Sequence, residues 1–78
     1  MENFRWNINT PKEELEKYGF YCEYGTWHYD LCVDTDEHQF EVMGVLILNS
    51  GGSIDAAGRT DDDLIKQLIQ DGIIYEVK

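Results

Sequence analysis

Between residues 20 and 48, apolar and polar side chains alternate in three successive runs, which is the pattern of half-buried strands. The runs cover residues 20–24, 27–33 and about 38–48. Because successive side chains of a strand point to opposite faces, the apolar residues gather on one face of the sheet. The predicted core face consists of Phe20, Cys22, Tyr24, Trp27, Tyr29, Leu31, Val33, Phe40, Val42, Leu46 and Leu48.

Two turns set the predicted register of this sheet. The Gly-Thr pair at residues 25–26 fits a two-residue type II′ turn, which has glycine first, and it places Tyr21 opposite Asp30. A second turn over residues 34–37 places Glu41 opposite Asp30 as well, on the other neighbouring strand. Directly opposed carboxylates destabilise a sheet, so we expect this pair to splay apart into water.

A short strand and a short helix precede the sheet. Alternation over residues 4–8 predicts the strand. Thr10 is the predicted N-cap of a helix over residues 11–18, and Glu13 closes a capping box with it. Gly19 suits the left-handed conformation in which helices often end.

A second helix and a last strand complete the chain. Residues 49–53 form a loop, and the path of residues 50–59 stays open between a helical turn and a short edge strand. Thr60 is the predicted N-cap of the second helix, with three aspartates in its first turn. Gly72 ends that helix, and residues 73–77 form the final strand.

These elements predict a single α+β domain over residues 1–78 with the order β-α-β-β-β-α-β. We expect a largely antiparallel sheet of four to five strands with both helices packed on one face. The order resembles a ferredoxin-like pattern with an added or extended hairpin. That likeness concerns architecture and implies no function.

The charge of the chain is predominantly negative. Residues 18–58 contain no lysine or arginine, and six basic against sixteen acidic residues give a net charge of −10. Such a field repels nucleic acid and anionic membranes and attracts basic surfaces. The N-terminal residues lack the apolar core of a signal peptide, so we expect a cytoplasmic protein. Cys22 and Cys32 fall on opposite faces of the predicted sheet, which disfavours a disulfide between them.

The sequence argues against catalysis and cofactors. His28 lies among carboxylates of types that bind zinc or manganese, namely Glu23, Asp30 and Glu41, but the tight spacing of a metal motif is missing. Cys32 shares a face with His28 but lies about 13 Å away along the strand, too far for a nucleophile and its base. The three aspartates at residues 61–63 exclude a phosphate site there. We therefore expect no metal, no cofactor and no enzymatic activity.

The leading hypothesis is a small acidic binding protein that inhibits a larger protein by blocking a basic, nucleic-acid-binding surface. In size and charge, though in no motif, the chain resembles the DNA-mimic inhibitors and anti-defence proteins of phages, including anti-CRISPR proteins. The predicted partner-binding residues are Tyr21, Glu23, Asp30, Asp34, Asp36, Glu37 and Glu41.

Two alternatives remain. The first is an immunity or antitoxin-like inhibitor of a basic nuclease, anchored by the apolar residues Met43, Val45 and Ile47. The second is a homodimeric structural or assembly module that is sealed along an exposed sheet edge.

Overall fold

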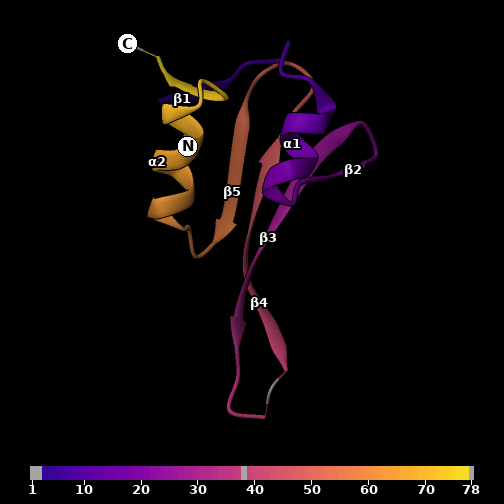
Figure 1. The fold of residues 1–78 in the computed structure, drawn as a ribbon, viewed down its shortest axis with the longest axis vertical. Coiled ribbons are helices and arrows are strands. Elements are labelled where there is room, and N and C mark those ends of the chain that lie inside the picture. The colour runs from indigo at the N-terminus through magenta and orange to yellow at the C-terminus, as the bar shows by residue number, and fades with distance from the viewer. Residues whose placement is uncertain (1–2, 38, 78) are drawn as a thin grey trace.

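The computed structural model describes residues 3–37 and 39–77 and has an α+β fold, as the sequence predicts (Figure 1). Four strands form an antiparallel sheet in the order β2-β3-β4-β5, and β1 and β6 pair as a separate two-stranded sheet. Residues 50–59, for which the sequence left a helical turn and an edge strand as alternatives, contain the extra edge strand β5. The elements are β1 (Phe4–Trp6), α1 (Lys12–Tyr18), β2 (Tyr21–Glu23), β3 (Thr26–Asp34), β4 (Phe40–Leu48), β5 (Ile54–Gly58), α2 (Asp62–Gln70) and β6 (Ile74–Glu76).

The core lies on one face of the four-stranded sheet. Leu46 and Leu48 point to the same side of β4 and join one buried cluster with Leu15 of α1 and Leu68 of α2. Both helices therefore lie on this face, as expected. The other buried members of the cluster are Trp6, Phe20, Ile54, Ile73 and Ile74.

The strand β1 is joined both to β6 and to the β4–β5 turn. The backbone amide of Trp6 donates to the Gly52 carbonyl at 3.0 Å, and the Trp6 indole donates to the Asn49 carbonyl at 2.7 Å. The strand ends at Trp6, so the predicted continuation to Ile8 is wrong. Ile8 lies in a turn and is 57% exposed, because Asn7 accepts hydrogen bonds from the residues that follow it.

Both predicted N-caps are wrong by one residue. The Thr10 hydroxyl donates to the Asn7 carbonyl at 2.7 Å, and Pro11 caps α1 without a side-chain hydrogen bond. In α2 the cap is Asp61, whose carboxylate accepts from the backbone amides of Asp63 at 3.0 Å and Leu64 at 3.3 Å. The predicted helix end at Gly19 is confirmed, since its φ of 103° is left-handed.

The β2–β3 hairpin turns one residue earlier than predicted. Tyr24 and Gly25 both have positive φ, 53° and 78°, which is the signature of a type I′ turn. Tyr21 therefore faces His28 instead of Asp30. Tyr24 takes no part in the core and is 95% exposed. The β-branched Thr26 is left in the strand, where such residues are favoured.

A β-bulge interrupts the pairing of β3 with β4. The register runs regularly as far as Leu31 opposite Gly44, then shifts so that Cys32 faces Val42. The predicted opposition of Asp30 and Glu41 is wrong. Asp30 faces Val45, and Glu41 faces Val33 on the other side of the sheet.

The turn beyond the bulge is longer than the sequence predicted. It lies between Asp34 and Phe40, and a 2.8 Å hydrogen bond from the Thr35 amide to the Gln39 carbonyl closes it. His38, the predicted start of the third run, lies outside the described residues.

Past the bulge, β3 and β4 leave the body of the protein as an arm, defined here as residues 32–37 and 39–42. Figure 1 shows the arm extending well beyond both helices, which gives the molecule dimensions of 41 × 24 × 21 Å. Phe40 and Val42, assigned to the core by their alternation, are 78% and 54% exposed here. Cys22 is also exposed rather than buried. Phe40 and Val42 leave the predicted core face because the bulge turns them to the opposite side of the sheet.

Candidate protein-binding face

The face of the four-stranded sheet opposite the core carries the candidate site. Cross-strand partners share a face, and two rows of such partners cross the sheet here. The first row runs from β2 to β5 and the second from β3 to β5. The open face, as we call it, consists of Tyr21, His28, Ile47 and Asp55 in the first row, Asp30, Val45 and Ala57 in the second, and Glu23 beside them.

The open face has an apolar centre and an acidic surround. Val45 and Ile47 are half-buried in the middle of β4. Asp30 and Asp55 stand on the neighbouring strands β3 and β5, and Glu23 stands on the edge strand β2. All four strands fall within the stretch that lacks lysine and arginine. The sheet therefore supplies no positive side chain that could neutralise these carboxylates.

Tyr21 is held in place on this face by two neighbours. Its hydroxyl donates to Asp30 Oδ1 at 3.0 Å, and its ring stacks on His28 with centroids 5.4 Å apart and planes 16° apart. The hydrogen bond to Asp30, then partial desolvation and the negative charges of Asp30 and Glu23, raise the pKa of Tyr21. Tyr21 is 41% exposed, so this positioned ring presents an aromatic surface to solvent.

The structure divides the predicted binding residues among three places. Tyr21, Glu23 and Asp30 lie together on the open face, and Asp34 continues the same side of β3 along the arm. Two further carboxylates, Asp36 and Glu37, lie in the turn at the tip of the arm, and Glu41 points to the other face.

Sequence reasoning missed three residues on this side of the sheet. Asp55 was missed because the path of β5 was open, and Phe40 and Val42 were assigned to the core. The facing glycines Gly44 and Gly58 are the signal that could have revealed the bulge, since a glycine inside a strand often marks one.

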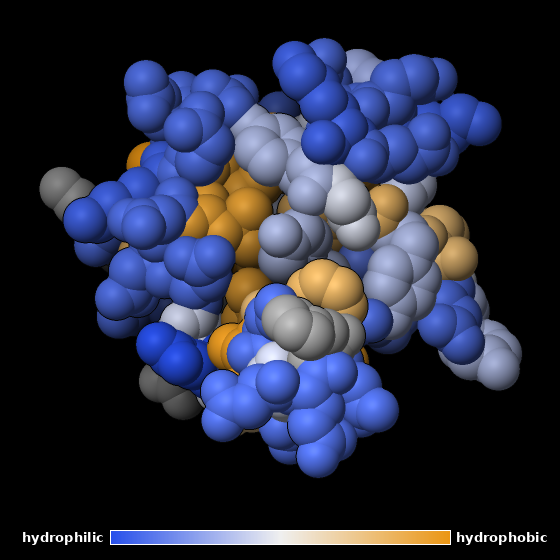
Figure 2. Space-filling model, turned by 60° about the horizontal axis from the view of Figure 1, so that its bottom comes forward, coloured by the Kyte–Doolittle hydropathy of each residue, from blue (hydrophilic) through white to orange (hydrophobic). Residues whose placement is uncertain are grey.

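A groove of about 610 Å³ lies on the core side, between the arm and the N-terminus of α2 (Figure 2). Seen from the arm end, apolar side chains lie at the bottom of a hollow that hydrophilic side chains surround. Its lining residues include Tyr29, Leu31, Val33, Met43, Arg59, Asp61, Asp62, Asp63 and Lys66.

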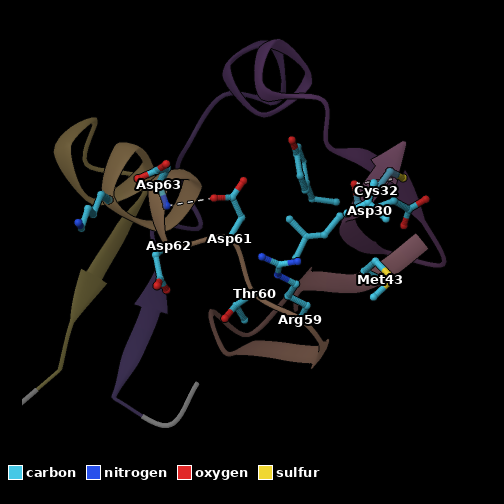
Figure 3. Close-up of a pocket in the computed structure, with 12 residues that line it drawn as sticks. Asp30, Cys32, Met43, Arg59, Thr60, Asp61, Asp62 and Asp63 are labelled. Carbon is cyan, nitrogen blue, oxygen red and sulfur yellow. Dashed lines mark hydrogen bonds between the residues drawn. The ribbon is translucent and has the colours of Figure 1, made fainter. Parts of the chain in front are cut away.

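The groove mixes both signs of charge and has no converging set of ligands. Asp61 is engaged as the cap of α2, and Figure 3 shows the three aspartates pointing in different directions. Within residues 3–37 and 39–77, no group of three or more His, Cys, Asp or Glu side chains is placed to hold a metal ion. Cys22 and Cys32 are both free thiols at the surface.

Comparisons with protein-family models, curated protein sequences and solved structures find no match to this chain. In the described part of the chain, no helix has both the length and the apolar character needed to cross a membrane.

Proposed function

We propose that this protein is a non-enzymatic inhibitor that binds a basic, nucleic-acid-binding surface of a larger protein and blocks it. One observation carries the proposal: an entire four-stranded sheet without a lysine or arginine has its open face turned away from both helices. Such a face attracts a cationic surface and has no internal counter-charge to lose on binding.

The mechanism is occupation of cationic sites. Glu23, Asp30 and Asp55 would accept charge-assisted hydrogen bonds from arginines and lysines that otherwise hold phosphates. Tyr21 would add an aromatic contact that is already ordered before binding, because Asp30 and His28 hold it. In kind, this is the action of the DNA-mimic and anti-CRISPR proteins that the chain resembles in size and charge.

The exposed apolar residues favour a second candidate, an immunity-like inhibitor with an apolar anchor. Met43 is 40% exposed, and Val45 and Ile47 form the half-buried centre of the open face. Under this alternative Val45→Asp abolishes binding, and added salt weakens it little. Under the leading proposal salt weakens binding steeply.

The test compares two charge reversals of equal size. Glu23→Lys with Asp30→Lys alters the open face, and Glu16→Lys with Asp71→Lys alters the two helices. Each pair changes the net charge from −10 to −6. All four side chains are exposed, so both variants should fold.

We expect wild type and the helix variant to capture the same basic protein from a host lysate at low salt and to displace nucleic acid from it. The open-face variant should do neither. Equal capture by both variants, or a captured protein that keeps its nucleic acid, would contradict the proposal.

A further inference from the structure

The bulge changes which side chains the arm presents. A regular ladder would set Met43 opposite Cys32 and Glu41 opposite Asp34, so two like charges would meet. With Met43 as the extra residue, the pairs are Cys32 with Val42 and Asp34 with Phe40. The bulge therefore removes Glu41 from the side of the open face and places two apolar side chains there instead.

The result is a continuous apolar row along β4. We call it the β4 ridge, and it consists of Ile47, Val45, Val42 and Phe40. Its partners on β3 run from His28 to Asp34, six steps at about 3.3 Å each, so the ridge is about 20 Å long. Its side chains become more exposed outward, from half-buried at Ile47 to 78% exposed at Phe40.

Carboxylates accompany the ridge on both sides. Asp30 and Asp34 face Val45 and Phe40 from β3, and Asp55 faces Ile47 from β5. Neighbouring strands lie about 4.8 Å apart, so these charges border the apolar row directly. A second copy of this chain would bring a further −10 charge and the same aspartates against them.

We propose that the β4 ridge docks an amphipathic helix of the partner whose apolar stripe is flanked by lysines and arginines. The inference rests on the proposed function and specifies the segment of the partner that binds. A helix of about 14 residues is about 21 Å long, which matches the ridge. Its apolar side chains at i, i+3, i+4 and i+7 cover the ridge, and its flanking cations reach Asp30, Asp34 and Asp55.

The test uses a synthetic helical peptide of about 16 leucine and lysine residues, with leucines at the i, i+3, i+4 and i+7 positions, beside a scrambled peptide of the same composition. Binding is measured by fluorescence anisotropy at about 0.15 M salt, where exposed charges beyond about 8 Å are screened. We expect the amphipathic peptide to bind at least about tenfold more tightly than the scrambled one.

The variant pair Phe40→Ser with Val42→Ser should weaken this binding at least about tenfold, because it removes the exposed half of the ridge. Ile8→Ser is the matched control, since Ile8 is 57% exposed and Val42 is 54% exposed. Its affinity should stay within about twofold of wild type. Adding the amphipathic peptide to the wild-type protein should also change amide chemical shifts centred on β4 and the arm, which locates the binding site without any substitution.

Four results would overturn the inference. Equal binding of the two peptides would show attraction by charge alone, which leaves the proposed blocking function standing. An equal loss in the Ile8→Ser control, or shift changes centred away from β4, would place the contact elsewhere. If wild type sediments as a dimer and the variant with Phe40→Ser and Val42→Ser sediments as a monomer, the ridge binds a second copy of this chain.

Discussion

At the scale of single residues, two facing glycines allow β4 and β5 to approach closely beside the bulge. Gly44 on β4 lies directly opposite Gly58 on β5, and Gly58 has a φ of 75° that other residues rarely adopt. A Cβ on Gly44 would lie 2.9 Å from the Ala57 carbonyl oxygen and collide with that of Arg59. The two backbones therefore approach too closely here for any side chain.

Gly44→Ala should lower the free energy of unfolding by about 2 kcal/mol or more, because the backbone atoms it meets cannot rotate away. Gly51→Ala is the control, since a Cβ there meets no atom within 4 Å, and it should change stability by less than about 0.5 kcal/mol. Urea denaturation measures both. Similar midpoints for the two variants would contradict the close approach.

Tyr21 provides a prediction about pH. Its pKa is raised in the folded protein, chiefly by its hydrogen bond to Asp30. The hydroxyl therefore contributes all of its stabilisation below its unfolded pKa of about 10 and loses it as the pH rises through the folded pKa. The advantage of wild type over Tyr21→Phe in urea denaturation should be constant up to about pH 9 and disappear at higher pH.

Asp30→Asn provides the control for this interpretation. It removes the charge that holds the proton on Tyr21, so the tyrosinate absorbance of Tyr21 should develop at lower pH than in wild type. Identical titrations in the two proteins would show that Asp30 does not act on Tyr21.

At the scale of elements, the sequence predicted the strands and helices better than their pairing. Alternation located β2, β3 and β4, and the apolar spacing located α2, because both patterns depend on local burial. The register of paired strands depends on the turn that joins them, and a turn sequence can adopt several backbone conformations of similar energy. Tyr24 adopts a left-handed conformation that its residue type does not suggest.

The same limit applies to the candidate site. Tyr21, Glu23 and Asp30 were placed on one face correctly, since an even shift of register leaves every side chain on its side of the sheet. Glu41, Val42 and Phe40 were not, because one extra residue in β4 exchanges the two faces. The net charge was available from composition, but its distribution around the arm was not.

An engineered disulfide tests the register of the arm. In a background with Cys22→Ser, Val42→Cys should form a disulfide with Cys32 on mild oxidation, because the two residues are direct cross-strand partners. Met43→Cys should not, although a regular ladder would pair it with Cys32. Free-thiol titration and mass spectrometry distinguish the two variants. A disulfide that forms only in the Met43→Cys variant would contradict the β-bulge.

At the scale of the whole molecule, the charge works against the fold. A net charge of −10 is carried by a chain of 78 residues, and the structure buries no charged side chain among its described residues. The carboxylates repel one another through water, most strongly in the sheet and arm, where no lysine or arginine intervenes. Under the proposed function, binding of a cationic partner would relieve this repulsion and recover the energy lost to it.

Added salt should therefore stabilise the free protein. Raising sodium chloride from about 0.01 M to about 0.15 M shortens the Debye length from about 30 Å to about 8 Å, and the Tm should rise by several degrees. The variant Glu16→Lys with Asp71→Lys, at net charge −6, should gain less over the same range. Calorimetry gives both values, and a Tm independent of salt would show that the repulsion is negligible.

The pairing of β1 with β6 has a consequence for synthesis on the ribosome. Trp6 is buried among residues that include Ile73 and Ile74, from the opposite end of the sequence. During translation the first strand must wait, without its partner, until β6 has emerged from the exit tunnel. A nascent chain stalled before residue 73 would expose an indole that its own later residues should cover, which is a surface that chaperones bind.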